Sequence, residues 1–348
     1  MNTAAKAMGR DARAALAFGV TELGAAGVPS AALSAELLLL HVVRHDRAWL
    51  YAHPDYVLSV EEEATYEEFL ARRASGVPTQ YLTGVQEFWG LEFEVTPSVL
   101  IPRPETEHVV EVALARLAET ATLRGVAHIT IADVGTGSGC IAVALARELP
   151  QARLVAADIS AEALEVAQRN IDRHGVSDRV RVLQTDLLEG AASQKQKPER
   201  ESRLFDLIVS NPPYVARDQA GELAVEVREH EPHEALFGGA TGAEIYARLI
   251  AQAAAALRPG GILILELGYD GAERVRALFL ENASDENATS ENATDENATA
   301  SAPAPQVWVD VRVVNDLAGI PRVISAIRAE ESAPDTIEAV KRLARVPR

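Results

Sequence analysis

The fold is decided by the stretch Asp133-Val134-Gly135-Thr136-Gly137-Ser138-Gly139. An apolar run that begins at Ile129 precedes it, and a segment with helical spacing, Ile141 to Leu149, follows it. A glycine-rich loop between a strand and a helix lets the backbone approach a ligand at the helix N-terminus. Its spacing, G-x-G-x-G, differs from the G-x-G-x-x-G that seats a pyrophosphate, which argues against a dinucleotide. Taken alone, the loop is also compatible with an ordinary tight turn.

Strands and helices alternate downstream of this loop. Apolar runs predict strands at 129–134, 153–157, 180–184, 205–209 and 261–267, and helical spacing predicts helices at 141–149, 161–174 and 243–257. Two further strands are expected near the end of the chain, at 307–314 and 322–327. This alternation predicts an α/β fold with a doubly wound, mostly parallel sheet. In such sheets the ligand site lies beyond the carboxyl ends of the strands.

Helical spacing dominates the first part of the chain. Apolar residues recur there at three- and four-residue intervals, which predicts a small helical domain over residues 1–78. The stretch Gln86 to Val95 then alternates partly at period two around Gly90, as a hairpin would. We expect this hairpin, within residues 79–100, to link the helical domain to the α/β domain.

The α/β domain is expected to span residues 101–330 and to be followed by a C-terminal tail at 331–348. Residues 282–302 repeat Asn-Ala-Thr with Asp-Glu, a composition that cannot bury enough apolar surface to fold. We therefore predict a disordered insert in that segment. Ser193 to Arg203 is a shorter polar insertion.

Composition and charge argue against several classes of function. The formal net charge of -18 opposes nonspecific binding of nucleic acid, which requires clustered Lys and Arg. No apolar run approaches the roughly 20 residues of a membrane span, and the start of the chain lacks the apolar core of a secretory signal. The single cysteine, Cys140, rules out an internal disulfide, and the histidines show no metal-ligand spacing. We expect a cytoplasmic monomer with no metal, no membrane association and no direct nucleic-acid partner.

Acidic residues follow two of the predicted strands. Asp158 ends the second strand, where a carboxylate can accept hydrogen bonds from both hydroxyls of a ribose. Asp186 and Leu187 follow the third strand, where they could border an adenine ring. Each acid is also compatible with a helix cap or a solvated loop charge. Together with the glycine loop, the strand ends favour a nucleoside cofactor.

The most specific local motif is Asn211-Pro212-Pro213-Tyr214, which follows the fourth predicted strand. The Asn211 side-chain oxygen and the Pro212 carbonyl can each accept one N–H of a planar NH2 group. The two prolines stiffen the turn, and Tyr214 offers a ring on which an amide or a base can stack. The motif therefore predicts methyl transfer to a planar nitrogen, although Asn-Pro and Pro-Pro also occur in ordinary loops. No cysteine lies near the motif, which argues against a thiol nucleophile.

Several motifs resemble a known family. The glycine loop, the acidic end of the second strand and NPPY resemble the class I S-adenosylmethionine-dependent methyltransferases that act on nitrogen. Four further segments are similar to the peptide-chain release factor glutamine N5-methyltransferases, the PrmC/HemK family: QYLTG (80–84), EFWGLEFEV (87–95), LIPRPETE (100–107) and DLAG (316–319). LIPRPETE with NPPY is the most specific pair, because the related ribosomal-protein glutamine methyltransferases share NPPY and differ in the PRPETE segment.

The resemblance implies a role for each matching residue. It assigns binding of S-adenosyl-L-methionine to Asp133, Gly135, Thr136, Gly137, Ser138, Gly139, Asp158, Asp186, Leu187 and Asn211. It assigns the substrate pocket to Leu100, Arg103, Pro104, Asn211, Pro212, Pro213 and Tyr214. The catalytic residues would be Asn211, Pro212 and Tyr214. The implied substrate is the glutamine of the Gly-Gly-Gln motif in class 1 peptide-chain release factors, which the helical domain would grip.

Two other functions are compatible with the same motifs. An adenine-N6 methyltransferase acting on DNA or RNA would use the same geometry after base flipping, but the acidic chain and the compact helical N-terminus argue against it. A non-catalytic S-adenosylmethionine-binding module is disfavoured by the intact NPPY motif and glycine loop. This chain departs from the family in its two polar insertions and at Leu187, where some members have an aromatic residue.

Overall fold

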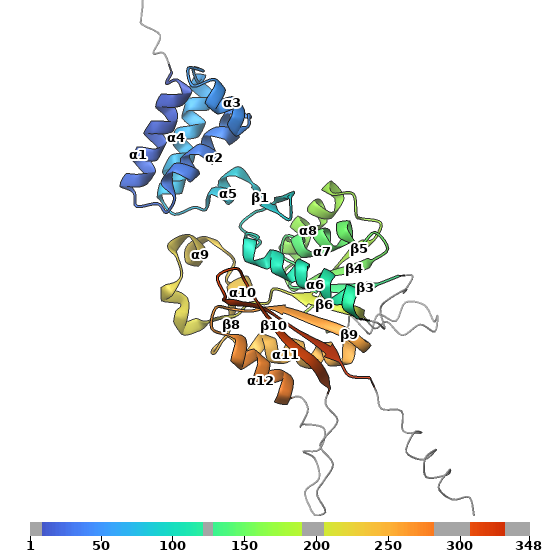
Figure 1. Cartoon of the computed structure of the whole chain (residues 1–348). Coiled ribbons are helices and arrows are strands. Elements are labelled where there is room, and N and C mark those ends of the chain that lie inside the picture. The colour runs from blue at the N-terminus through green and yellow to red at the C-terminus, as the bar shows by residue number, and fades with distance from the viewer. Residues whose placement is uncertain (1–8, 121–127, 190–204, 282–306, 331–348) are drawn as a thin grey trace, which may run out of the picture.

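A computed structural model describes residues 9–120, 128–189, 205–281 and 307–330. Helices from the start of the chain lie at one end of the molecule, and a larger α/β part lies at the other (Figure 1). The predicted insert at 282–302, the polar insertion Ser193–Arg203 and the tail at 331–348 lie outside the described residues. Within the described residues, the structure contains no helix that is both long enough and apolar enough to cross a membrane.

The first part of the chain is helical, and its helices are α1 (Ala12–Ala25), α2 (Ala31–Val43), α3 (Arg47–Ala52), α4 (Val60–Ala74) and α5 (Thr79–Thr83). The three longer helices confirm the sequence prediction, whereas α3 and α5 are too short to show a helical period. We call α1 to α4 the N-terminal bundle.

The N-terminal bundle has a small apolar core of its own. Tyr66 of α4 is 1% exposed, and its hydroxyl donates to the Ala35 carbonyl of α2 at 3.1 Å. Gly19 of α1 makes room for this ring, because a Cβ at that position would lie 2.1 Å from the Tyr66 hydroxyl. A larger residue at position 19 would therefore force α1 away from α4.

The predicted hairpin is present as β1 (Val85–Phe88) and β2 (Leu91–Glu94), which pair antiparallel. Its turn, Trp89-Gly90, has positive φ at both residues, as a tight hairpin turn requires. Phe88 and Phe93 are buried in the core of the α/β part. The hairpin therefore packs on the α/β part, and the proposed boundaries of the domains stay a prediction.

The α/β part is built on a seven-stranded sheet with the strand order β10-β11-β9-β6-β3-β4-β5. The strands are β3 (Thr130–Val134), β4 (Arg153–Asp158), β5 (Val180–Gln184), β6 (Phe205–Ser210), β9 (Leu257–Glu266), β10 (Trp308–Asn315) and β11 (Pro321–Arg328). β3, β4, β5, β6 and β9 run parallel, and β11 and β10 add antiparallel pairs at one edge. This confirms the mostly parallel sheet that the sequence predicts.

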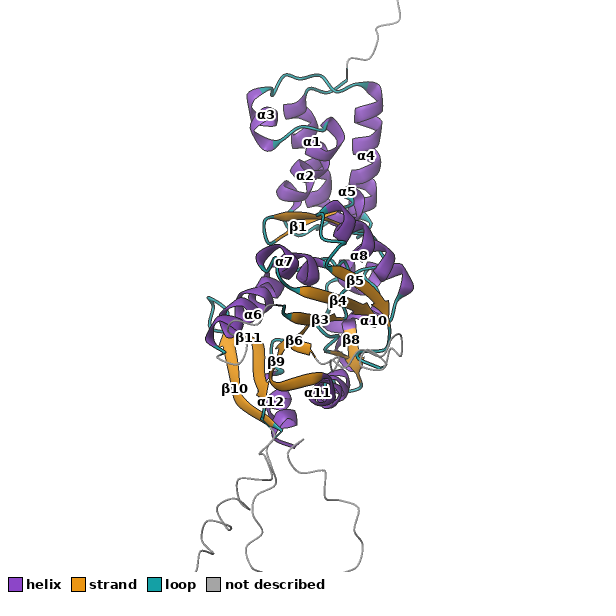
Figure 2. Cartoon of the chain, turned by 90° about the vertical axis from the view of Figure 1, so that its right-hand side faces the viewer, coloured by secondary structure: helices purple, strands orange, loops and turns teal. Residues whose placement is uncertain are grey.

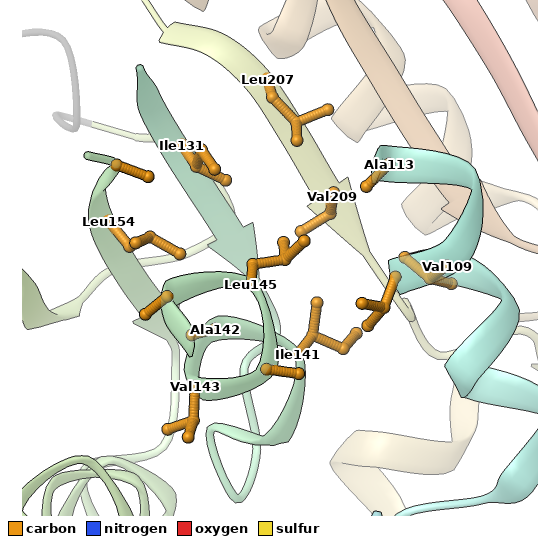
Figure 3. Packing of buried hydrophobic residues seen from close by; sticks show 14 of the residues in the cluster. Val109, Ala113, Ile131, Ile141, Ala142, Val143, Leu145, Leu154, Leu207 and Val209 are labelled. Carbon is orange, nitrogen blue, oxygen red and sulfur yellow. The ribbon is translucent and has the colours of Figure 1, made fainter. Parts of the chain in front are cut away.

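Helices cover both faces of this sheet (Figure 2). One face packs against α6 (Glu107–Glu119), α7 (Cys140–Glu148) and α8 (Ala161–Arg173), and the other against α11 (Glu244–Ala256) and α12 (Ala272–Glu281). In Figure 3, side chains of β3, β4 and β6 point toward α7, with α6 beside them. Burial on both faces explains why the inner strands β3, β4, β6 and β9 read as apolar runs and do not alternate. α6 and α12 have no counterpart in the sequence prediction.

Cys140 begins α7 beneath the glycine loop and is buried. Burial raises the pKa of its thiol to about 12, so the thiol stays protonated at neutral pH. Cys140 is therefore a small packing residue of the apolar core.

Short elements fill the connection from β6 to α11. They are β7 (Val215–Ala216), η3 (Arg217–Glu222), α9 (Val225–His230), α10 (His233–Leu236) and β8 (Phe237–Gly239). Before β3, η1 (Pro104–Thr106) leads directly into α6. The sequence predicts none of these elements, since each lacks a full helical or strand period.

α4 meets α9 through an ion pair that joins the N-terminal bundle to the α/β part. Arg73 Nη2 lies 2.5 Å from Glu226 Oε2, and its Nη1 donates to the Val77 carbonyl at 3.3 Å. The Arg73 side chain is 5% exposed, whereas that of Glu226 is 32% exposed. The arginine side chain is therefore shielded from water more completely than the glutamate side chain.

Replacing Arg73 with methionine is expected to lower the free energy of unfolding by about 1 to 2 kcal/mol, because it leaves the half-buried Glu226 without its cation. Urea denaturation measures this loss. Arg72→Met is the matched control, since Arg72 is half exposed and lies 3.8 Å from Glu68 in a surface pair. That control should change stability by less than about 0.5 kcal/mol. Equal losses for the two variants would show that the contact between α4 and α9 adds nothing.

Candidate active site

A cavity of about 600 Å³ lies at the carboxyl ends of β3, β4, β5 and β6. Most of the predicted site residues line it: Leu100, Arg103, Gly135, Thr136, Gly137, Ser138, Asp158, Asp186, Leu187, Asn211 and Pro213. The other predicted residues lie outside its lining: Asp133, Gly139, Pro104, Pro212 and Tyr214. The volume suits a ligand of nucleoside size or larger.

The glycine loop turns tightly between β3 and α7. The backbone N–H groups of Gly135 and Thr136 both donate to the Ala157 carbonyl of β4, at 2.8 and 2.9 Å. Gly137 adopts a φ of +54°, and Gly139 adopts a φ of +82° as the N-cap of α7. Glycine tolerates these left-handed conformations without strain, which leaves the loop backbone facing the cavity.

Asp133 lies beneath the loop and shapes it. Its Oδ2 accepts from the Thr136 hydroxyl at 2.6 Å and from the Ala142 backbone N–H at 3.0 Å. Complete burial raises the pKa of this carboxyl to about 7, against the lowering effect of the two hydrogen bonds. Asp133 thus ties the glycine loop to the first turn of α7.

Asp158 lines the cavity at the end of β4. Its Oδ2 accepts from the Gly137 backbone N–H at 2.9 Å, and its Oδ1 accepts from the Ser160 backbone N–H at 3.0 Å. Burial raises the pKa of the carboxyl, and these backbone hydrogen bonds oppose the rise. A carboxylate has about four acceptor sites, so each oxygen can still accept one hydrogen bond from a ligand.

Asp186 and Leu187 form the cavity edge after β5. Asp186 Oδ2 lies 2.6 Å from Arg248 Nη2 of α11, and both side chains are partly exposed. Leu187 has a left-handed φ of +54° and packs against the apolar core on the α11 side of the sheet. The ion pair with Arg248 links this strand end to α11, and the sequence does not reveal it.

The wall opposite the glycine loop, residues 100–104, is held by a buried glutamate. Glu231 Oε1 lies 2.5 Å from Arg103 Nη2, and its Oε2 accepts from the Ile101 backbone N–H at 3.4 Å. Burial raises the pKa of the Glu231 carboxyl, while Arg103 lowers it. The ion pair with Glu231 therefore anchors Arg103, which lines the cavity and belongs to the predicted substrate pocket.

Asn211 lies at the cavity rim with a defined side-chain orientation. Its Nδ2 donates to the Thr106 hydroxyl oxygen at 3.1 Å. The Asn211 side-chain oxygen therefore remains available as an acceptor. Thr106 is 2% exposed and lines the same cavity.

Tyr214 lies under the rim and lines a second cavity of about 380 Å³. Gly268 permits the ring to lie there, because a Cβ at that position would be 2.9 Å from Tyr214 Cδ2. The Tyr214 hydroxyl is 3.5 Å from Glu266 Oε1, and burial raises the pKa of the phenol. Pro212 is buried and lines neither cavity, whereas Pro213 lines the larger one.

Several cavity residues carry no signal in the sequence analysis. Thr106 belongs to the quoted segment LIPRPETE, but that segment gives it no role. The cavity wall also includes Ile159 and Ser160 after β4 and residues 232–235 and 237. Residues 232–237 lie in short elements without periodicity, so only the folded chain brings them to the cavity.

The lining suits a nucleoside-containing methyl donor. The glycine loop offers backbone groups, Asp158 offers acceptors for hydroxyl groups, and Leu187, Ile159 and Phe237 offer apolar surface for a base. In the part of the chain that the structure describes, no group of three or more His, Cys, Asp or Glu side chains is arranged to hold a metal ion.

Two segments of this chain match family models of known proteins. Residues 14–84 match the family model of the PrmC N-terminal domain, and residues 111–230 match that of the methyltransferase small domain. The second match, together with the mostly parallel sheet, confirms the class I methyltransferase fold.

Curated relatives cover most of the chain. A release factor glutamine methyltransferase of Koribacter versatilis is 41% identical over 302 residues, which is 87% of this chain and 93% of that protein. Proteins of the same name from Geobacter sulfurreducens and Chlorobaculum tepidum are each 45% identical over 253 residues. That alignment covers 73% of this chain and 82% and 84% of the two relatives. This chain therefore belongs to the release factor glutamine methyltransferase family.

Proposed function

We propose that this chain transfers a methyl group from S-adenosyl-L-methionine to the side-chain amide nitrogen of the glutamine in the Gly-Gly-Gln motif of class 1 peptide-chain release factors. The observation that carries the proposal is the orientation of Asn211. Because its Nδ2 donates to Thr106, its side-chain oxygen is left to accept an N–H from a substrate amide at the cavity rim.

The cofactor would occupy the cavity between the glycine loop and the ends of β4 and β5. Backbone groups of Gly135 to Gly139 would surround its methionine part, and Asp158 would accept from its ribose hydroxyls. Leu187 would contact the adenine ring, and Asp186 would border it. The bound cofactor supplies a methyl group that its sulfonium already activates.

The protein's own contribution is to position the glutamine amide. Asn211 Oδ1 and the Pro212 carbonyl would each accept one N–H, which fixes the plane of the NH2 group. Tyr214 would border the flat face of the amide, and residues 100–104 would close the pocket. The amide nitrogen would be held for in-line attack on the donated methyl group, and it would release its proton to water as charge develops. Positioning of this kind is worth several kcal/mol of barrier.

The proposal extends to partner and location. The N-terminal bundle, within the proposed domain 1–78, would bind the release factor so that its glutamine loop reaches the cavity. A release-factor substrate implies action in the cytoplasm, and the acidic chain fits a protein partner better than a nucleic acid. We expect the active species to be a monomer.

Transfer of label from methyl-labelled S-adenosylmethionine to a purified release factor tests the proposal. We expect transfer to the release factor and none to adenine-containing DNA or RNA. Transfer to nucleic acid alone would favour the adenine-N6 function. Calorimetric binding of the cofactor without transfer to either substrate would favour a non-catalytic binding module.

A further inference from the structure

A buried carboxyl group lies beneath the NPPY motif, outside the residues that the proposed mechanism uses. Glu266 ends β9 and is 3% exposed. Among the described residues, its Oε2 has no hydrogen-bond partner. An ionisable side chain in such a position costs stability, so its retention needs a reason beyond packing.

Glu266 sits on a rigid support. Its backbone carbonyl accepts from the hydroxyl of Tyr246 at 2.7 Å, and Tyr246 is 2% exposed. Burial raises the pKa of the carboxyl, and the Thr106 hydroxyl and the charge of Arg322 oppose that rise. The neighbouring charge of Glu105 adds to it. Glu266 therefore faces one cation, one anion and two hydroxyl groups.

The two hydroxyl groups lead to the two ends of the NPPY motif. Tyr214 donates to Glu266 Oε1 at 3.5 Å, and the Thr106 hydroxyl lies close enough to the same carboxyl group to lower its pKa. The Thr106 oxygen in turn accepts from Asn211 Nδ2 at 3.1 Å. A hydroxyl has a single proton, so a Thr106 hydroxyl that donates to Glu266 can act only as an acceptor toward Asn211.

The direction of these hydrogen bonds selects one orientation of the Asn211 amide. With Thr106 as an acceptor, Nδ2 must face Thr106 and Oδ1 must face away from it. If the Thr106 proton were free to turn toward Asn211, the amide could rotate by half a turn and present Nδ2 to the substrate. An NH2 group in that position would repel the N–H of a glutamine amide.

We propose that Thr106 and Glu266 are positioning residues for methyl transfer: together they orient the Asn211 amide. This inference rests on the proposed function and adds two residues to it. Neither acts on the substrate through its own bonds. Their effect reaches the reaction through the side-chain oxygen of Asn211.

The matched substitutions Thr106→Val and Thr106→Ser test the orientation of Asn211. Valine keeps the shape of threonine and removes the hydroxyl, so the single-turnover rate with saturating cofactor and release factor should fall by about 10- to 100-fold. Serine keeps the hydroxyl, and its rate should stay within about threefold of the wild type. The dissociation constant for S-adenosylmethionine should be unchanged in both variants.

Thr130→Val is the control for the substitution itself. The Thr130 hydroxyl also donates to a buried carboxylate, that of Asp206 at 2.9 Å, but at the opposite end of the sheet. This variant loses the same kind of hydrogen bond far from the cavity, so its single-turnover rate should equal that of the wild type. A loss matching that of Thr106→Val would mean that the rate follows stability and would overturn the proposal.

Glu266→Leu and the double variant Thr106→Val/Glu266→Leu test whether the two residues act as a unit. Removing either side chain should break the same series of hydrogen bonds. The double variant should therefore lose little more rate than the slower single variant. Independent losses that multiply would contradict the proposal, and so would a normal rate in Thr106→Val. If circular dichroism shows that Glu266→Leu does not fold, the comparison of Thr106→Val with Thr106→Ser still tests the proposal. If the wild type transfers no methyl group, the proposed function itself is overturned. If the wild type transfers normally and Thr106→Val has the same rate, only the positioning role is overturned.

Discussion

Replacing Asn211 with alanine is expected to lower the single-turnover rate of methyl transfer by about 100-fold or more, in a protein that remains folded. The substitution removes the acceptor that orients the substrate amide, and orientation supplies most of the acceleration when the methyl donor is already activated. Asn211 is only half-buried at the cavity rim, so its loss should leave the sheet intact. Saturating cofactor and release factor isolate the chemical step, and circular dichroism verifies folding.

Two comparisons sharpen this prediction. Asn211→Asp keeps an acceptor but adds a charge and removes the Nδ2 donor to Thr106, so it should also lose about 100-fold. Tyr214→Phe should be far milder than Tyr214→Ala, because the 3.5 Å contact of its hydroxyl is weak and the ring does the packing. A near-normal rate in folded Asn211→Ala would refute the orientation mechanism.

Asp158→Ala is expected to weaken cofactor binding by roughly 30- to 150-fold, because paired hydrogen bonds to a carboxylate are worth about 2 to 3 kcal/mol. The structure adds a second reason. Asp158 also holds the backbone N–H of Gly137, so alanine would loosen the glycine loop as well as remove acceptors for the ribose. Calorimetry with S-adenosylmethionine measures the dissociation constant directly.

Asp186→Ala provides the comparison for Asp158. The Asp186 carboxylate pairs with Arg248 and is partly exposed, so its removal should weaken cofactor binding by less than about tenfold. The rate at saturating cofactor should change little in either variant. An unchanged dissociation constant in Asp158→Ala would remove that residue from the cofactor site.

Much of the fold follows from local sequence patterns. The strands of a parallel sheet are buried on both faces, so β3, β4 and β6 stand out as apolar runs, and the loops between them end at predictable positions. The carboxyl ends of such strands meet at one edge, which is why Asp158, Leu187 and Asn211 line one cavity as expected. Their individual roles stay predictions.

The supporting contacts could not be predicted, because they join residues far apart in the chain. Asn211 and Thr106 are 105 positions apart, and Arg103 and Glu231 are 128 positions apart. Neither partner carries a periodicity or spacing that points to the other. Such contacts depend on how η1 and the β6–α11 connection settle on the sheet, and short irregular elements leave little pattern in a sequence.

Mass spectrometry of a release factor tests the central claim most directly. The factor is incubated with this protein and S-adenosylmethionine, digested, and the peptide that contains Gly-Gly-Gln is fragmented. The account predicts one added methyl group, located on the glutamine side chain and absent when folded Asn211→Ala replaces the wild type over the same short interval. An unmodified glutamine in the presence of wild-type protein and bound cofactor, or a methyl group on another residue, would contradict it.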